Sequence, residues 1–473
     1  MRVPVALIAG LAATLGACVE PAPARPQAIV VVHADLPVRL ADRLLLEVLA
    51  DDGTGALVAC ADGCVLERVV GEEDGPGVVA WPVSFGVTGA ASPRYVRAVL
   101  YPRGRTGPDG PLPEVAIEHV ARLVVDGVVE QHVVLGGECA GIPSTRRVDG
   151  TTCDAGRVVP IGDAAPGRGP DAPITGTFRA SYDRGCAGAP REGAPDEAEV
   201  CIRGGTYLMG DDRVIGLGRW WDGAPEHLVT VSPFFLDTHE YTVGRLRRLL
   251  ERTSGLALPV ARGAPGSATE HCNWDPADRA LDAHPLNCVT WSLANAICEA
   301  EGRRLATEAE WEWAAGNREH EHLQPGGDRE PIFRRDLGCA GSSRVPPDPP
   351  PDIRCTRPVG SPRACPGLAC DEADLAQWVP DRTLDGVLDM AGNASEWVRD
   401  AYQLYTDPCW APGHGPDPFC DPLLADPIHG ASARGGDGAR DGYYWELAAR
   451  RRVDSASRAA SASRGFRCAR DDG

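Results

Sequence analysis

The chain contains no lysine, so its 47 basic side chains are all arginines, and they are outnumbered by 67 aspartates and glutamates. We attribute the missing lysine, together with abundant alanine, glycine and proline, to a GC-rich genome. The formal charge of −20 argues against nucleic acid or anionic lipid surfaces as partners. The longest N-terminal apolar run, from Val3 to Leu15, is too short to span a bilayer. At 473 residues, the chain can form two or three domains.

Residues 1–18 have the pattern of a lipoprotein signal peptide, with Arg2, the apolar run and then small residues. The end of this segment, Leu15-Gly-Ala-Cys18, resembles a bacterial lipobox, which predicts that Cys18 is the lipidated first residue of the mature protein. Plain secretion is the alternative. Because Val19 follows where a retention signal would show aspartate, we expect export to the outer membrane, on its periplasmic or cell-surface face, with the lipid anchor as the only membrane contact.

The 17 cysteines agree with export, since removing Cys18 leaves an even number for disulfides, which form in oxidising compartments. No pair has the CxxC spacing of a zinc site. Cys186 and Cys201 are candidates for one disulfide. The short-range candidates are Cys60–Cys64, Cys365–Cys370 and Cys409–Cys420.

Composition divides the chain after the signal peptide. Residues 19–27 form a Pro/Ala tether, and residues 28–135 contain short β-type runs separated by Gly, Pro and Asp, which predicts a small all-β sandwich domain without catalytic features. Residues 136–196 are rich in Gly, Pro, Asp and Arg, and we predict a linker that buries little and is partly held by disulfides. Residues 197–473 form the last domain. The predicted strands are centred on residues 29–32, 44–49, 78–83, 95–101 and 121–125.

Three helices can be placed in the last domain, and each begins at a threonine that can cap it: Thr242, Thr290 and Thr307. Thr307 and Glu310 form the pattern of a capping box. Gly255 is expected to end the first helix and Gly302 the second. The predicted buried faces consist of Leu246, Leu249 and Leu250; of Leu293, Ala294, Ile297 and Cys298; and of Trp311.

The stretch from Gly386 to Asp400 carries the strongest functional signal. Its turn at Gly392-Asn393 is flanked by Asp389 and Glu396, and two carboxylates beside exposed backbone carbonyls are the hard oxygen donors that calcium requires. An ordinary Gly-Asn turn with solvated acids is the alternative interpretation.

This stretch resembles the Gly-Leu-x-(Asn/Asp)-(Met/Ile)-x-Gly-Asn-x-x-Glu-Trp signature of the formylglycine-generating enzyme, or sulfatase-modifying factor, family. The resemblance covers roughly residues 197–473, and it implies an α+β, C-type-lectin-like fold and a disulfide between Cys298 and Cys468. Further blocks occur in the family's order: Gly204–Gly210, Pro225–Val231, Phe235–Thr242, Arg304–Trp313, Arg434–Gly436 and Gly465–Ala469.

The resemblance also implies a calcium site at Asp389, Gly392, Ala394 and Glu396, so we expect structural calcium.

One family block is defective. Family members that make formylglycine hold copper(I) between two thiolates, a soft pair suited to a soft ion. At the matching positions this chain has Arg440 and Trp445, with Asp441 in place of the family's histidine, and no cysteine occurs from Asp421 to Gly465. We therefore expect no copper and no formylglycine formation. The other residues of this degenerate site are Asp437 and Tyr444.

Two sequence features could in principle replace the lost copper site: a second cysteine pair, or the iron-binding motif of other relatives. Cys409 and Cys420 precede the defective block, but their spacing is typical of a loop disulfide. The His-x3-His-x-Glu motif by which other relatives hold iron does not occur.

Two functions remain. The first is a pseudoenzyme, a calcium-stabilised module that binds a peptide or glycan, with Tyr443, Tyr444 and Trp445 as stacking surface. The second is an oxidoreductase of the same family with an altered, copper- or iron-dependent site, or an enzyme that uses Asp437 and Asp441 as acid, base or metal ligands.

Overall fold

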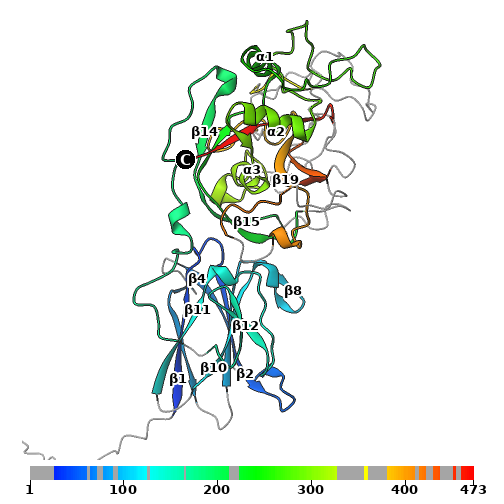
Figure 1. The fold of residues 1–473 in the computed structure, drawn as a ribbon. Helices are drawn as coiled ribbons and strands as arrows, with labels where there is room; N and C mark the ends of the chain where they lie inside the picture. Colours follow the sequence, from blue (N-terminus) through cyan, green and yellow to red (C-terminus); the bar gives the residue numbers. More distant parts are fainter. Residues whose placement is uncertain are drawn as a thin grey trace, which may run out of the picture.

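The computed structural model describes residues 26–60, 64–71, 78–88, 94–124, 128–164, 167–211, 223–327, 356–360, 381–410, 415–421, 430–436, 451–453 (backbone only) and 460–473. They form two bodies that follow one another along a long axis, with the N-terminal strands in one and the α-helices in the other (Figure 1). Cys18, Cys365, Cys370 and the segment 437–445 lie outside the described residues. Within them, no helix is both long and apolar enough to cross a membrane.

Two sheets form the first body. A three-stranded sheet has the order β11-β1-β6, with β1 parallel to β11 and antiparallel to β6. The larger sheet has the order β10-β7-β2-β4-β5, and β3 pairs with β2. The strands of these sheets are β1 (Gln27–Ala34), β2 (Arg43–Asp51), β3 (Leu57–Ala59), β4 (Val65–Gly71), β5 (Val78–Ala80), β6 (Val83–Thr88), β7 (Arg94–Tyr101), β10 (Ile117–Leu123) and β11 (Val128–Leu135). Two short strands, β8 (Thr106–Gly107) and β9 (Gly110–Pro111), form a separate hairpin. The 3-10 turn η1 (Pro113–Val115) follows this hairpin.

Alternating side chains of these strands meet in one shared core, because successive residues of a strand point to opposite faces. Val30 and Val32 of β1 and Leu44 and Leu46 of β2 belong to the same buried cluster. Strand β7 is buried on both faces, in keeping with the weak alternation of apolar and polar residues along it. The predicted run 78–83 divides between β5 and β6, and the predicted runs 29–32, 44–49 and 95–101 lie within β1, β2 and β7. The predicted run 121–125 overlaps only the last residues of β10, which begins at Ile117.

The segment 136–196 buries more than its composition predicted. It contains the hairpin of β12 (Thr151–Asp154) and β13 (Arg157–Pro160), together with the 3-10 turns η2 (Gly137–Cys139), η3 (Ala180–Tyr182) and η4 (Pro195–Glu197). The Cys139–Cys153 disulfide and Phe178 are buried against the core of the two sheets. A small number of well-placed apolar and disulfide groups therefore anchors a segment that is otherwise rich in glycine and proline.

The second body combines short strands with three α-helices in the part of the chain that the structure describes, so its class is α+β. One sheet has the order β14-β17-β23-β18, a second β21-β20-β19-β22, and β15 and β16 form a hairpin. The strands are β14 (Glu199–Ile202), β15 (Gly205–Met209), β16 (His227–Val231), β17 (Phe234–Asp237), β18 (Arg304–Leu305), β19 (Ser395–Ala401), β20 (Ala431–Arg434), β21 (Arg451–Val453), β22 (Arg464–Phe466) and β23 (Cys468–Asp471), and the short turns are η6 (Arg318–His320) and η7 (Pro408–Trp410).

The three predicted helices are confirmed as α1 (Val243–Arg252), α2 (Trp291–Ala300) and α3 (Glu308–Ala315). Each threonine caps its helix through its hydroxyl oxygen, and Thr307 forms the predicted reciprocal capping box with Glu310. Helix α1 ends at Arg252 with Thr253 as its C-cap, so the prediction that Gly255 stops it placed the end too late.

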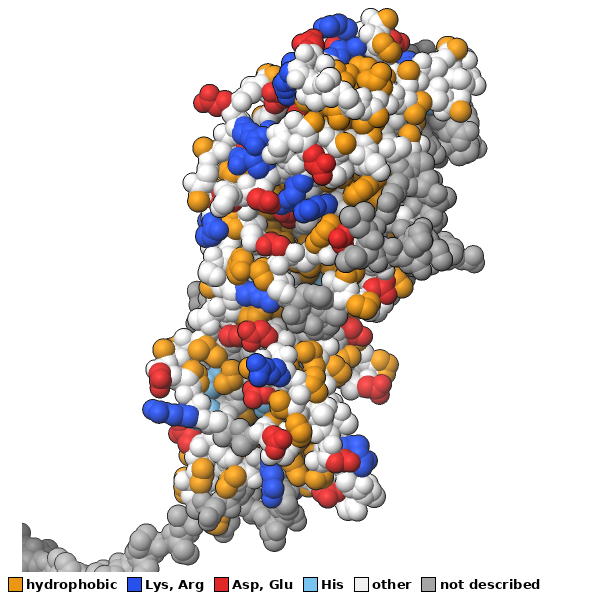
Figure 2. Space-filling model, viewed as in Figure 1, with side chains coloured by type: hydrophobic (Ala, Val, Ile, Leu, Met, Phe, Trp, Pro, Cys, Tyr) orange, Lys and Arg blue, Asp and Glu red, His pale blue; other side chains and the backbone are white. Residues whose placement is uncertain are grey.

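On the face shown in Figure 2, acidic and basic side chains are interspersed over both bodies. The described residues of this face offer no broad basic area of the kind that binds a phosphate backbone.

Six disulfides join the twelve cysteines of the described residues. Cys298 of α2 and Cys468 of β23, the pair implied by the family resemblance, are bonded to each other across 170 residues of sequence. The spacing-based pairs Cys60–Cys64, Cys186–Cys201 and Cys409–Cys420 are also formed, and Cys272 pairs with Cys288.

We predict that removing the Cys298–Cys468 disulfide by the double substitution C298A/C468A lowers the free energy of unfolding by about 2–5 kcal/mol, because the bond closes a long loop in the unfolded chain. The matched control is C60A/C64A, which opens a loop of only 4 residues and should have a smaller effect. Denaturant unfolding of the two variants measures both. Equal losses would contradict an effect that depends on loop length.

Candidate functional site

The base of the degenerate site is well defined although Asp437, Arg440, Asp441, Tyr444 and Trp445 lie outside the described residues. Strand β20 leads into the segment, and β21, which follows it, pairs antiparallel with β20. The described residues directly before the segment, at the end of β20, are Arg434, Gly435 and Gly436.

Arg434 at the end of β20 is fully buried between two carboxylates of α3. Its Nη1 lies 3.3 Å from Glu308 Oε1, and its Nη2 pairs with Glu312 Oε2. The Trp311 ring lies 5.4 Å from its guanidinium carbon, a cation–π distance. Burial raises the pKa of Glu312 above its ordinary value, although Arg434 opposes the rise. One guanidinium thus ties helix α3 to the strand that enters the site.

The next residue, Gly435, has no room for a side chain. Its φ is +76°, and a Cβ would lie 2.8 Å from the carbonyl oxygen of Met390. The Gly436 N–H then donates to the Ala391 carbonyl. These contacts fix the entry of the degenerate segment against the stretch that contains the predicted calcium ligands.

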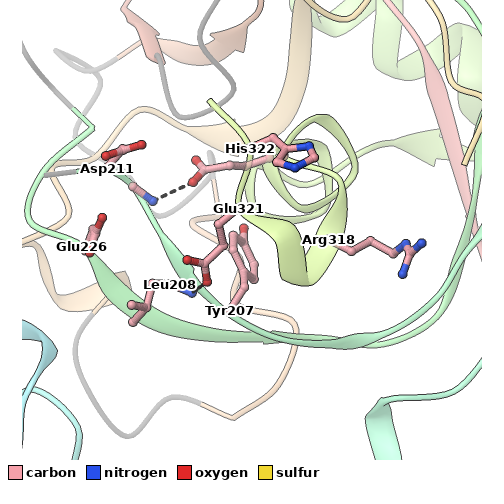
Figure 3. Close-up of a pocket in the computed structure, with 10 residues that line it drawn as sticks. Tyr207, Leu208, Asp211, Glu226, Arg318, Glu321 and His322 are labelled. Atoms are coloured by element: carbon pink, nitrogen blue, oxygen red, sulfur yellow. Dashed lines mark hydrogen bonds between the residues drawn. The ribbon is translucent and has the colours of Figure 1, made fainter. Parts of the chain in front are cut away.

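A small pocket of about 20 Å³ lies between β15 and the turn that follows α3 (Figure 3). Its wall carries the carboxylates of Asp211, Glu226, Glu312 and Glu321. Two of them are fixed by backbone donors of the hairpin strand, since the Leu208 N–H donates to Glu321 and the Gly210 N–H donates to Glu312 at 2.6 Å. Glu312 is therefore shared between this pocket and Arg434.

The predicted calcium ligands occupy the turn before β19 and its first residues. Asp389 and Asn393 have positive φ values of 59° and 66°, so the turn bends at these two residues. Asp389 is buried, and its Oδ2 accepts a hydrogen bond from the Gly360 N–H. Burial raises the pKa of Asp389 to about 6, and Asp381 adds to the rise.

A further buried carboxylate, Glu240, faces this turn from the segment before α1. It accepts hydrogen bonds from the Ala394 N–H at 3.1 Å and the Asn393 amide at 3.2 Å. Burial raises the pKa of Glu240 well above its ordinary value, and the charges of Asp389 and Glu396 act in the same direction.

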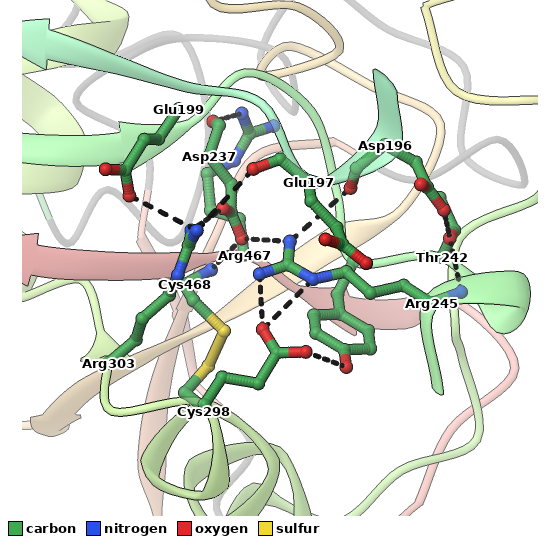
Figure 4. A network of polar contacts seen from close by, with 12 residues as sticks. Asp196, Glu197, Glu199, Asp237, Thr242, Arg245, Cys298, Arg303, Arg467 and Cys468 are labelled. Carbon is green, nitrogen blue, oxygen red and sulfur yellow. Dashed lines mark hydrogen bonds and ion pairs between the residues drawn. A yellow bond between two sulfur atoms is a disulfide. The ribbon is translucent and has the colours of Figure 1, made fainter. Parts of the chain in front are cut away.

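Arg467, which directly precedes Cys468 in the C-terminal Gly-Phe-Arg-Cys block (Figure 4), is a cation whose charge opposes the rise in the pKa of Glu240. It binds Glu396 in a bidentate manner, with Nη2–Oε1 and Nε–Oε2 distances of 2.6 and 2.7 Å. The Trp311 indole N–H also donates to Glu396 Oε2, at 2.7 Å. Arg467 further donates to the carbonyls of Leu388 and Asp237.

The donor set of the turn is compatible with calcium in kind, since every donor is oxygen. Both oxygens of Glu396 already accept hydrogen bonds, which leaves Asp389 as the better carboxylate ligand. Within the described ranges, no three Asp, Glu, His or Cys side chains come close enough together to hold a metal ion. An ion at this turn would therefore depend on the backbone carbonyls of Gly392 and Ala394, which the family resemblance also names.

The described residues offer no free thiolate pair for copper. Cys409 and Cys420, weighed above as replacements for the missing thiolates, are bonded to each other. The other cysteines of the described residues are also in disulfides, so none of them is a thiolate ligand.

Comparison with known proteins agrees with this arrangement. The model of the sulfatase-modifying factor enzyme 1-like domain matches residues 187–472, which is more than half of the chain. The α+β body, the order of its sequence blocks and the Cys298–Cys468 disulfide are features of one class of protein, that of the sulfatase-modifying factors. The chain belongs to the sulfatase-modifying factor family.

The chain is similar to the following two relatives and one solved structure. The formylglycine-generating enzyme of Streptomyces coelicolor is 25% identical over 333 residues, which cover 62% of this chain and 94% of the relative. The inactive C-alpha-formylglycine-generating enzyme 2 of Mus musculus is 26% identical over 239 residues, 44% of this chain and 71% of the relative. The structure of PvdO from Pseudomonas aeruginosa is 22% identical, covers 60% of this chain and 98% of PvdO, and has a TM-score of 0.41.

Several buried residues of the site were not predicted. Glu240, Arg434 and Arg467 all lie in blocks that the sequence analysis had quoted, but their charges gave no sign of their partners. Burial of a charge requires a partner. A charged residue inside one of these blocks was therefore the sequence feature that could have indicated a buried ion pair.

We predict that Arg434→Met lowers the free energy of unfolding by about 3–5 kcal/mol, because it leaves Glu308 and Glu312 buried without their cation. The control is Arg168→Ala, at a side chain that is 92% exposed, and no measurable change is expected there. Denaturant unfolding at neutral pH compares both with the wild type. An Arg434→Met protein as stable as the wild type would mean that this guanidinium does not hold the base of the site.

Proposed function

We propose that the chain is a surface-anchored lipoprotein whose C-terminal domain is a non-catalytic binding module for a peptide or glycan, stabilised by calcium. The observation that carries the proposal is the presence of Arg440 and Trp445 at the positions of the two copper thiolates. A guanidinium is always protonated and an indole N–H only donates, so neither can ligate copper(I).

The buried frame beside the lost site supports a binding role. Arg434, Glu308 and Glu312 form buried ion pairs at the end of β20, directly before the segment 437–445. Tyr443, Tyr444 and Trp445 would offer aromatic surface there, which suits stacking on a sugar ring or a peptide side chain. The mouse relative described as inactive gives a precedent within the family for loss of the reaction.

The N-terminal half completes the proposal. Cys18 would carry the lipid in the outer membrane, residues 19–27 would form a tether, and the two sheets of residues 28–135 would be a β-sandwich domain between the anchor and the binding module. The six disulfides suit an oxidising compartment.

Calcium would be held by Asp389, Gly392, Ala394 and Glu396. The support is electrostatic: Glu240, Asp389 and Glu396 are buried near one another, and Arg467 is the cation that binds this group directly. A divalent ion would reduce the repulsion among these carboxylates and brace the turn on which Gly435 packs.

We predict no formation of formylglycine. The protein comprising residues 27–473, with its disulfides intact, is loaded with copper(I) under oxygen and incubated with a Cys-x-Pro-x-Arg peptide. Mass spectrometry follows the peptide for conversion of cysteine to the aldehyde. The Streptomyces coelicolor relative serves as the positive control. Conversion by this chain would overturn the non-catalytic proposal and would mean that other cysteines rebuild the copper site.

We further predict that calcium raises the melting temperature of the chelator-treated protein. At a concentration 100 times the dissociation constant, one bound ion adds about 2.7 kcal/mol of stability. Asp389→Ala should remove most of this gain, whereas Asp52→Ala, at an exposed acid of the N-terminal sheets, should leave it unchanged. Melting curves in EGTA and in excess calcium measure the effect. A wild-type protein with the same melting temperature in both buffers would rule out a structural calcium ion.

A further inference from the structure

The hairpin of β15 and β16 is buried on both of its faces. Tyr207 and Met209 of β15 and Val229 and Val231 of β16 belong to the core of the C-terminal body. Leu208, between Tyr207 and Met209, belongs instead to the core of the N-terminal sheets. Because side chains alternate along a strand, the two faces of one hairpin pack against two different bodies.

The register of the hairpin places the second face in one row. Thr206 pairs with Thr230 and Leu208 with Leu228, so these four side chains point the same way. Leu228 packs against the same N-terminal core as Leu208. The two threonine hydroxyls lie 2.9 Å apart, and Thr206, Leu208 and Thr230 are buried.

Three arginines outside the C-terminal body contact this face. Arg39, from the turn between β1 and β2, donates to the Thr206 carbonyl at 2.8 Å. Arg179, from the segment after the sheets, donates to the Thr230 hydroxyl at 3.2 Å.

The third, Arg105, lies in the connection between β7 and β8. It forms an ion pair with Glu226, and both side chains are largely buried. Glu226 also lines the pocket of Figure 3, so an N-terminal arginine helps to set the wall of a C-terminal pocket.

These contacts differ from those of two domains on a flexible linker. Interfaces between domains of one chain are usually polar and permit relative motion, unless apolar packing joins them. Here the apolar core of the N-terminal sheets continues into the hairpin through Leu208 and Leu228, and charged contacts surround it.

We propose that the N-terminal sheets are the permanent intramolecular partner of the β15–β16 hairpin, and that the two bodies unfold and move as one. The N-terminal sheets then hold the C-terminal body, which begins at the β15 end of the two bodies in Figure 1, in a fixed orientation. The inference depends neither on the lipid anchor nor on the ligand proposed above. It gives the N-terminal sheets a role in shaping the C-terminal body, beyond that of a spacer.

The test follows the two bodies separately in the whole mature chain. The protein is equilibrated in increasing guanidinium chloride, pulsed with deuterated water and digested for mass spectrometry. Peptides that contain β7 report the N-terminal sheets, and peptides that contain β17 report the C-terminal body. In the wild type we expect the two midpoints to coincide. Distinct midpoints in the wild type would overturn the proposal.

Leu208→Asp places a carboxylate in the shared apolar row and should separate the two midpoints. Leu258→Asp makes the same substitution at a leucine that is 58% exposed in the C-terminal body, and its midpoints should still coincide. Arg105→Ala is the milder second variant, for use if Leu208→Asp does not fold. It should speed exchange in β16 as well as in the β7–β8 connection. Coincident midpoints in Leu208→Asp, or exchange in Arg105→Ala that changes in the N-terminal peptides alone, would show that the hairpin does not couple the bodies.

Discussion

Asp237 at the end of β17 is a buried residue that binds several separate segments of the C-terminal body. Its carboxylate pairs with Arg303, lies 2.9 Å from Arg245 Nη1 of α1, and accepts from the Cys468 N–H at 2.9 Å. Its carbonyl accepts from Arg467. One buried acid therefore joins a strand, a helix, the segment before β18 and the C-terminal strand (Figure 4). A body with short strands and much irregular chain needs such fixed points, because few regular ladders satisfy its backbone.

Buried arginine–carboxylate pairs serve the same purpose at the site. Each guanidinium has five donors in a fixed plane, so it can bind a carboxylate and backbone carbonyls at once, as Arg467 does with Glu396, Leu388 and Asp237. Such pairs add little net stability compared with apolar packing, but losing one partner is costly. They specify position more than they stabilise. At the end of β20, Arg434 is held in this way between Glu308 and Glu312, directly before the segment that lacks the copper thiolates in the sequence.

The sequence alone was sufficient to predict structural features that depend on residues close together in the chain. The three capped helices are local features, since Thr307 and Glu310 satisfy each other within one turn, and they were predicted correctly. The partners of Glu240 and Arg467 were not, because Glu240 meets Asn393 and Arg467 meets Glu396 only after distant segments pack. The hairpin was harder still. Thr206 to Met209 was noted only as part of the block Gly204–Gly210, and a run this short does not indicate which bodies cover its two faces.

The hairpin of β15 and β16 also makes the C-terminal body depend on the N-terminal sheets. If the N-terminal sheets were absent, Leu208 and Leu228 would face water, and Glu226 would lose Arg105. Exposed apolar rows on strands favour association with other chains. The same contacts place one wall of the acidic pocket under the control of the N-terminal sheets, through Glu226. The family match begins at residue 187. The packing of β15 and β16 extends the proposed folded unit further, into the N-terminal sheets.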